Sequence, residues 1–333
     1  MKRPGFWDRP PASPGWQARV LAPVGALYAT ATAARVARGP GLRADVPVIC
    51  VGNLNLGGTG KTPTVIALIE RLTARGLEPH VVSRGYGGSM PGPVQVDERQ
   101  HSAAEVGDEP LLLSAFANTW VSKNRAAGVQ AAQAAGAQVI LLDDGFQNPA
   151  VAKDFSIIVV DAKHGFGNGR VTPAGPLREP VQIGLKRADM VLVIGSDGEQ
   201  EVFAENWGAG IPCPRISGEL LPLPTGMDWR GLNVLAFAGI GRPAKFFATL
   251  RNLGAKLIRA EALDDHQPLN GTLMKRLEIE AGALNAQLVT TEKDAVRLPK
   301  AFRQKVLTLP VRLEIADWSE VDAKLTSLGL LGK

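Results

Sequence analysis

The sequence predicts an α/β protein built on a P-loop parallel sheet flanked by helices, with a second, smaller domain. Short runs rich in β-branched residues alternate with helical patterns, which is typical of βαβ units. A glycine-rich loop follows the first of these runs and leads directly into a helical pattern. A chain of 333 residues with 45% hydrophobic residues can bury the core of two domains.

The first part of the chain contains the expected strands of the main sheet. These are Val46–Val51, His80–Ser83, Val139–Leu142, Ser156–Val160 and Met190–Ile194. Between the first two, Thr64–Arg75 has apolar residues at helical spacing, and Gly76 is placed to end that helix. This segment therefore predicts one complete strand–loop–helix–strand unit.

A stretch rich in proline and glycine, Asn206–Arg230, predicts a domain boundary rather than the interior of a sheet. Beyond it we expect a strand at Val234–Ala238, a turn at Gly239–Pro243, a helix at Lys245–Leu253 and a strand at Leu288–Thr291. A strand at Val306–Ile315 is expected to pair with Arg215–Leu223. The predicted domains are residues 1–213, with an N-terminal amphipathic helix, and residues 231–304, joined by a two-stranded linker of residues 214–230 and 305–316.

Composition limits the classes of function. Lys and Arg outnumber Asp and Glu by 37 to 32, which favours anionic partners such as phosphates or lipid head groups. From the two cysteines, Cys50 and Cys213, neither a disulfide framework nor a four-ligand zinc site can be built. The N-terminus has no apolar core of a signal peptide, and no uninterrupted apolar stretch is long enough to span a bilayer. We therefore expect cytosolic chemistry.

The segment Val46–Pro63 predicts a nucleotide-binding loop. Its candidate ATP-binding residues are Asn55, Leu56, Gly57, Gly58, Thr59, Gly60, Lys61 and Thr62. Backbone N–H groups and the helix N-terminus would face the phosphates, Lys61 would reach the β- and γ-phosphates, and the Thr62 hydroxyl would ligate Mg²⁺. Asn55 stands where the strict motif has glycine, and asparagine is the residue that best replaces glycine at positive φ.

A phosphoryl-transfer site also needs an acid at a strand end to handle the metal or its water. Asp143 and Asp144 follow the apolar run Val139–Leu142 and meet this need. The alternative is that this acidic pair only caps the next turn.

Together, several segments resemble the tetraacyldisaccharide 4′-kinase family. They are Val51–Pro63, Val82–Gly88, Val106–Pro110, Leu142–Gln147, Gly175–Glu179 and Thr290–Val296. The resemblance implies two α/β/α domains joined by a two-stranded linker, with the active site in the cleft. It also implies transfer of the ATP γ-phosphate to the 4′-hydroxyl of a tetraacyldisaccharide 1-phosphate, which yields the bisphosphorylated lipid A precursor, lipid IVA.

The resemblance extends to individual residues. Asp108 and His266 match the pair thought to act in catalysis with Lys61 and Asp144, and Glu109 joins Thr62 and Asp143 as expected Mg²⁺ ligands. Arg84, Gln147 and Arg178 are candidates for contact with the substrate, although a solvated surface arginine is an equal alternative for Arg84 and Arg178. A histidine held by a carboxylate is suited to accept the proton of an attacking hydroxyl. The alternative for His266 is a cap on a surface turn.

Two other classes of P-loop protein are alternatives. A membrane-associated switch ATPase shares the Gly-Gly-x-Gly-Lys-Thr loop. Such ATPases have a signature lysine just before the first glycine, where this chain has Leu56, and this counts against them. A soluble sugar kinase explains the loop but not the N-terminal apolar segment. The basic residues are spread out and form no recognisable nucleic-acid module, so no nucleic acid is expected. No obligate protein partner is inferred.

The segment Trp16–Arg38 predicts a helix that lies on an anionic membrane surface. Apolar residues recur at three- and four-residue spacing, namely Trp16, Val20, Val24, Leu27, Tyr28 and Ala31, with arginines elsewhere on the helix. Pro23 is expected to start the regular helix or to kink it. The alternative is that the stripe packs on the protein's own sheet. The predicted location is peripheral, at the cytoplasmic face of the bacterial inner membrane.

Overall fold

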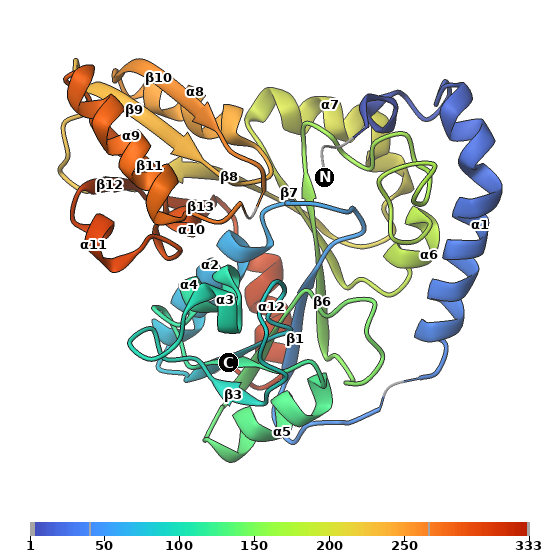
Figure 1. Ribbon diagram of the computed structural model, residues 1–333. Helices are drawn as coiled ribbons and strands as arrows, with labels where there is room; N and C mark the ends of the chain where they lie inside the picture. Colours follow the sequence, from blue (N-terminus) through green and yellow to red (C-terminus); the bar gives the residue numbers. More distant parts are fainter. Residues whose placement is uncertain (1–3, 40, 266, 332–333) are drawn as a thin grey trace.

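The computed structural model describes residues 4–39, 41–265 and 267–331. It contains two sheets, each covered by helices (Figure 1). In spatial order, the large sheet consists of β13 (Val311–Ile315), β8 (Arg215–Pro222), β7 (Met190–Ile194), β6 (Phe155–Asp161), β1 (Val48–Gly52), β5 (Val139–Asp143), β2 (Pro79–Ser83), β4 (Thr119–Val121) and β3 (Val94–Gln95). The small sheet consists of β10 (Lys256–Ala262), β9 (Asn233–Ala238), β11 (Gln287–Thr291) and β12 (Val306–Leu309). These strands confirm the predicted α/β fold class.

The helices connect and cover the strands. They are α1 (Trp16–Val36), α2 (Lys61–Thr73), α3 (Ala103–Val106), α4 (Asp108–Leu113), α5 (Arg125–Ala134), α6 (Val181–Leu185), α7 (Asp197–Trp207), α8 (Pro243–Asn252), α9 (Gly271–Ala283), α10 (Glu292–Ala295), α11 (Lys300–Arg303) and α12 (Ser319–Ser327), with short 3₁₀ turns at Gly5–Asp8 and Gly208–Gly210. In the large sheet only the β8–β13 and β3–β4 pairs are antiparallel, and the small sheet is parallel throughout.

The cores explain why the strand signals were continuous apolar runs. Helices α2 and α12 cover one face of the large sheet, and α5, α6 and α7 cover the other. Every residue of β1, β5 and β7 is therefore buried. Helices α8 and α9 cover opposite faces of the small sheet in the same way. All five strands predicted for the main sheet are confirmed, with ends that differ by at most two residues.

Two predictions about the connection between the sheets need correction. The stretch Asn206–Arg230 is not excluded from the sheet interior, because β8 lies between β7 and β13. Its prolines flank the strand or end it, so the ladder hydrogen bonds are kept. The predicted strand Val306–Ile315 is two strands, since Pro310 separates β12 in the small sheet from β13 in the large one.

The expected pairing across the connection is confirmed for its second half. Residues Val311–Ile315 pair antiparallel with Gly218–Pro222. Helix α12 then returns to the large sheet, where Asp322 pairs with Arg71 and, at 3.0 Å, with Arg75. The division into domains at residues 213, 230 and 304 stays a prediction.

Helix α1 lies along the outside of the molecule (Figure 1). It buries only a narrow line of small side chains, Ala18, Gly25 and Thr32. A Cβ at Gly25 would lie 2.8 Å from the Val171 carbonyl oxygen, so the helix approaches that loop at the glycine. The helix begins at Trp16 and not at Pro23. Pro23 is tolerated inside it because the Arg19 carbonyl, which loses its helical hydrogen bond, lies on an exposed part of the helix and can bond water. No helix in the described parts of the chain has both the length and the apolar character needed to cross a membrane.

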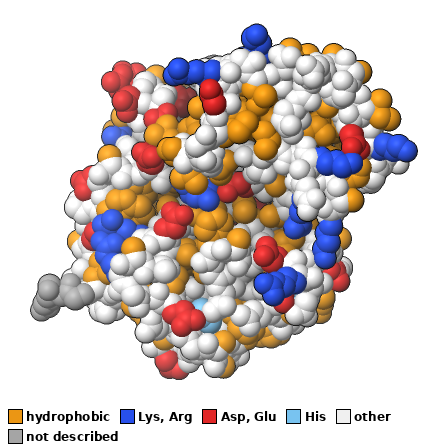
Figure 2. Space-filling model, turned by 90° about the vertical axis from the view of Figure 1, so that its left-hand side faces the viewer, with side chains coloured by type: hydrophobic (Ala, Val, Ile, Leu, Met, Phe, Trp, Pro, Cys, Tyr) orange, Lys and Arg blue, Asp and Glu red, His pale blue; other side chains and the backbone are white. Residues whose placement is uncertain are grey.

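The face turned to the viewer in Figure 2 carries acidic and basic side chains interspersed with apolar ones. Neither sign of charge gathers there into one field.

Candidate active site

The P-loop joins β1 to α2 at the carboxyl edge of the large sheet. Gly57 and Gly60 have φ values of 103° and 101°, which L-residues rarely adopt. A Cβ at Gly60 would also lie 2.6 Å from the Ile194 side chain. The glycines therefore allow a tight loop against β7, and α2 begins directly at Lys61.

Asparagines stabilise this loop in a way that the sequence did not reveal. The Asn53 amide donates to the Gly57 carbonyl at 3.2 Å and to the Thr59 hydroxyl at 3.1 Å. We expected Asn55 to replace the glycine of the motif at positive φ. This was wrong, because Asn55 does not adopt positive φ. Its buried side chain instead donates to the Gly165 carbonyl at 3.0 Å. Asn55 thus fastens the P-loop to the segment that precedes Arg178.

Lys61 lies beside the acids at the end of β5 and is largely buried. Its side chain is 11% exposed, and its Nζ lies 3.8 Å from Asp144 Oδ1. Arg178 donates to both oxygens of the same carboxylate, at 2.8 and 3.0 Å. Burial raises the pKa of Asp144, but Lys61 and Arg178 outweigh it, and the pKa is lowered. Asp144 is therefore ionised between two cations.

Asp143, the last residue of β5, has a different environment. Its Oδ2 accepts from the Ser83 hydroxyl at 3.0 Å, while its Oδ1 is buried without a hydrogen-bond partner. Burial, followed by the charges of Glu109 and Asp144, raises the pKa of Asp143 to about 6. Such a carboxylate is costly to keep charged unless a cation joins it.

Asp143→Asn is expected to stabilise the ligand-free protein by about 1–3 kcal/mol at neutral pH, because it removes a desolvated charge from acidic neighbours. The pKa of Asp143 is raised from 3.8, its ordinary value, to about 6 in the folded protein, so the folded state holds the proton more tightly than the unfolded state. This contribution to stability is complete below pH 3.8 and is lost as the pH rises through 6. Variant and parent should therefore differ little at pH 3.8 and increasingly above it, as measured by denaturant unfolding.

The matched control for this prediction is Asp97→Asn. Hydrogen bonds from the Arg99 backbone and the Gln100 side chain lower the pKa of Asp97, so its amide variant should not gain stability as the pH rises. An Asp143→Asn protein no more stable than its parent at pH 7 would contradict the electrostatic account of Asp143.

Asp108 and Glu109 begin α4 and face residues of α10 and the turn after it, which follow β11 of the small sheet. Lys293 Nζ lies 3.1 Å from Glu109 Oε1 and 3.9 Å from Asp108 Oδ2. Arg297 Nε lies 3.8 Å from Asp108 Oδ2. Burial lowers the pKa of Lys293, but Glu109 and Asp108 outweigh it, and the pKa is raised. The two acids are therefore held where the two sheets meet.

A second contact between the sheets lies next to the P-loop. Arg242, at the start of α8, pairs with Asp161 at the end of β6. A Cβ at Gly241 would lie 3.9 Å from the Gly58 nitrogen. The turn Gly239–Pro243 thus covers one side of the phosphate loop.

The other predicted site residues lie at different distances from this centre. Gln147 is buried and donates to the Asn53 carbonyl at 2.9 Å and to Glu179 at 3.0 Å. Arg84 is exposed at the end of β2. Thr62 is half-buried in the first turn of α2. His266 lies outside the described residues.

Sequence reasoning missed several residues that hold the acids. Arg125 is buried behind them and donates to the Asp143 carbonyl at 2.7 Å. Glu179 and Lys293 lie in segments that carry the family resemblance, but the sequence suggested no role for them. Their roles follow from partners far away in the chain, which no local pattern identifies.

The amino-acid sequence matches known proteins over nearly its whole length. The family model described as tetraacyldisaccharide-1-P 4′-kinase matches residues 17–329. The tetraacyldisaccharide 4′-kinase of Dinoroseobacter shibae is 62% identical, with 98% of each chain covered. The one from Rhodospirillum rubrum is 49% identical, over 94% of this chain and 93% of its own.

A solved structure is also similar, the crystal structure of LpxK from Aquifex aeolicus in complex with ATP. It superposes with a TM-score of 0.73 at 25% identity and covers 93% of this chain and 99% of that one. The full-length match of the family model and the identity with its curated members agree with this superposition, and the chain belongs to the tetraacyldisaccharide-1-P 4′-kinase family.

Proposed function

We propose that this protein transfers the γ-phosphate of ATP to the 4′-hydroxyl of tetraacyldisaccharide 1-phosphate in lipid A biosynthesis, forming lipid IVA. The observation that carries the proposal is the P-loop lysine beside the paired Asp144 and Arg178, in a chain 62% identical to a tetraacyldisaccharide 4′-kinase. Phosphoryl transfer requires positioning and charge stabilisation, and this arrangement supplies both.

The test is transfer of radiolabelled γ-phosphate to a lipid acceptor. A labelled disaccharide lipid supports the kinase. Release of free phosphate without acceptor labelling would favour a switch ATPase, and labelling of soluble sugars alone would favour a sugar kinase.

In the proposed mechanism, each residue has one task. The P-loop N–H groups and Lys61 bind the β- and γ-phosphates, and Arg178 holds Asp144 beside them. His266 accepts the proton of the 4′-hydroxyl as it attacks phosphorus, and Asp108 orients that imidazole. Arg84 and Gln147 are proposed to contact the acceptor, with Gln147 doing so from a side chain already held by Glu179.

The residues present fit Mg²⁺ as the cofactor. No cluster of three or more His, Cys, Asp or Glu side chains suited to a metal is found in the described ranges. Mg²⁺ in kinases needs only one or two carboxylates, because the substrate phosphates complete its ligands. The buried, unpartnered Oδ1 of Asp143 is such an oxygen, and Thr62 and Glu109 are the other candidates. When bound, Mg²⁺ would neutralise charge on the β- and γ-phosphates.

We propose that α1 binds the anionic membrane surface at the cytoplasmic face of the inner membrane. The predicted stripe does not pack on the protein's own sheet, because Trp16 is 70% and Leu27 is 72% exposed. Val20, Val24 and Tyr28 are exposed as well. An acceptor with several acyl chains stays in the bilayer, since each buried methylene contributes about 0.8 kcal/mol. The enzyme therefore has to come to it.

Replacing Val24 and Leu27 together with Asp is expected to lower binding to anionic vesicles by about tenfold or more, and lipid phosphorylation with it, because the stripe loses apolar area and gains repulsion. ATP binding should be unchanged. Sedimentation with phosphatidylglycerol vesicles measures the effect, and added salt should weaken binding by the parent protein.

The matched control adds the same charge to another face of the helix. Ala26 and Thr30 are exposed on α1 outside the stripe, so their double Asp variant should bind vesicles more strongly than the stripe variant. If the stripe variant unfolds, or sediments like its parent, the membrane contact does not run through these residues.

A further inference from the structure

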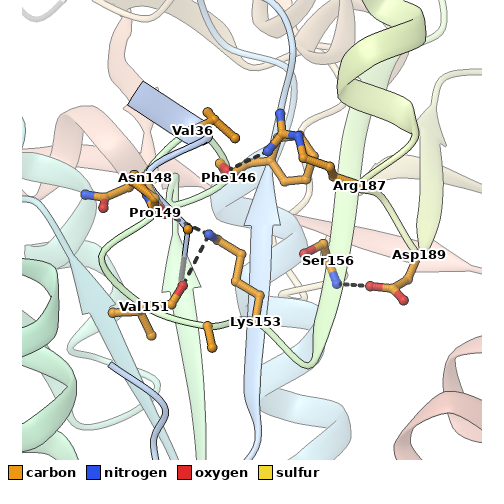
Figure 3. A pocket seen from close by; sticks show the side chains of 11 residues that line it. Val36, Phe146, Asn148, Pro149, Val151, Lys153, Ser156, Arg187 and Asp189 are labelled. Carbon is orange, nitrogen blue, oxygen red and sulfur yellow. Dashed lines mark hydrogen bonds between the residues drawn. The ribbon is translucent and has the colours of Figure 1, made fainter. Parts of the chain in front are cut away.

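A cavity of about 220 Å³ lies between the end of α1, the loop that follows β5, and the segment between α6 and β7 (Figure 3). Val36 and Phe146 form part of its apolar wall, and Lys153 and Arg187 are its two cations. One water occupies about 30 Å³ of liquid, so a group the size of a phosphate has room. None of the roles described above uses this cavity.

Lys153 is a partly buried cation whose hydrogen-bond partners in the described part of the chain are carbonyl oxygens. Its Nζ donates to the carbonyl oxygens of Asn148 at 2.7 Å and Val151 at 3.4 Å, and Figure 3 shows it at the loop that forms this side of the cavity. Within the described ranges, no carboxylate lies at ion-pair distance from it. Burial lowers the pKa of Lys153, the nearby Cys50 opposes this, and Arg187 lowers the pKa further. A desolvated ammonium in this position favours an anion.

The other charges around the cavity already have partners. Arg187 lies over the Phe146 ring at 4.4 Å and pairs with the buried Glu179. Its Nε nevertheless lacks a hydrogen-bond partner among the described groups. Asp189 accepts from the Ser156 nitrogen and from Lys324 Nζ, which offsets its charge. The charge of Lys153 is therefore left unbalanced.

A continuous series of side chains connects this cavity with the P-loop. Asp144, next to Lys61, is held by Arg178, and Arg178 lies 3.4 Å from Gln147 Oε1. Gln147 donates to Glu179 at 3.0 Å, and Glu179 pairs with Arg187. The cavity and the P-loop thus lie at the two ends of one chain of contacts.

We propose that this cavity binds the phosphate at the end of the acceptor opposite to the hydroxyl that is phosphorylated, through Lys153 with support from Arg187. The inference rests on the proposed function, because the family description names a tetraacyldisaccharide with a 1-phosphate. A phospholipid head group offers similar phosphate chemistry, and the cavity lies at the end of α1, so the test has to separate the two sources.

The test crosses a protein variant with an acceptor variant. With the 1-phosphorylated acceptor, Lys153→Gln should lower kcat/KM by about 10- to 100-fold, the effect of one charge-assisted contact. With an acceptor that lacks the 1-phosphate, parent and variant should have the same kcat/KM. That value should be about as low as the kcat/KM of Lys153→Gln with the phosphorylated acceptor. The KM for ATP should not change. Lys153→Arg should keep most of the activity, and Lys186→Gln, which removes an exposed charge nearby, should behave like the parent.

Several outcomes would overturn the proposal. Equal losses on both acceptors would mean that Lys153 only braces the loop carbonyls. Unchanged acceptor selectivity with weaker binding to phosphatidylglycerol vesicles would assign the cavity to a membrane lipid. If Lys153→Gln does not fold, Val36→Glu tests the same point by placing a negative charge at the wall, and it should impair only the phosphorylated acceptor.

The proposed function and this inference fail in distinguishable ways. A parent that phosphorylates neither acceptor contradicts the kinase assignment. A parent that phosphorylates both equally well contradicts only the phosphate site.

Discussion

Lys61→Ala is expected to lower phosphate transfer to the lipid acceptor by about a thousandfold or more while the protein stays folded. The Lys61 ammonium lies 3.8 Å from Asp144 at the first residue of α2, in a side chain only 11% exposed. Solvent screens a charge weakly in such a place, so its effect on the developing phosphate charge is large. Asp144 keeps both hydrogen bonds to Arg178, and the local structure should therefore persist.

Radiolabelled transfer at saturating ATP measures the loss, and thermal unfolding shows that the variant is folded. Lys256→Ala is the matched control, because Lys256 is an exposed lysine at the start of β10. It should transfer phosphate at the parental rate. Near-normal turnover by Lys61→Ala would exclude the proposed role of the P-loop.

Asp108→Ala and His266→Ala should each lower kcat by about 10²–10⁴, which is the usual contribution of a general base. The double variant should lose hardly more than either single one, because the residues act as one unit. Asp108 is suited to orient a base, since it is buried and held near Lys293 and Arg297 at the meeting of the two sheets. The assignment of His266 stays a prediction from the sequence.

Asp108→Asn sharpens this test because it keeps the shape of the side chain and removes its charge. Glu292→Gln is the matched control, since Glu292 is an acid of α10 that pairs with Arg312. Fully additive losses would mean that Asp108 and His266 work separately. An unaffected His266→Ala would point to another base, first of all Asp108. A loss confined to the KM for ATP would mean that Asp108 only holds the sheets together.

Much of the fold could be predicted because its signals are local. The strands β1, β5, β6 and β7 are covered on both faces, so they appear in the sequence as apolar runs. The segment Val306–Ile315 shows the limit of such signals. Two short strands separated by one proline resemble a single strand, and only the partners of each show that they belong to different sheets.

The stripe on α1 illustrates a second limit. Its spacing indicated an amphipathic helix, but the spacing is the same whether the apolar side packs on the protein or faces outward. The structure decided the question, because the packed face is the line through Ala18, Gly25 and Thr32 and the stripe lies elsewhere on the helix. Small residues permit that close approach and produce no strong apolar signal of their own.

The sequence by itself determined the P-loop, the acids at the end of β5 and five strands of the large sheet. Each of these depends on neighbours along the chain: glycines where the loop turns, apolar runs where strands are buried, and a lysine at the start of a helix. Only the tertiary structure decided that Arg178 holds Asp144, that Lys293 meets Glu109 and that Lys153 donates to the Asn148 carbonyl. Ion pairs depend on which loops emerge side by side at the sheet edge, and folding brings together residues far apart in the chain.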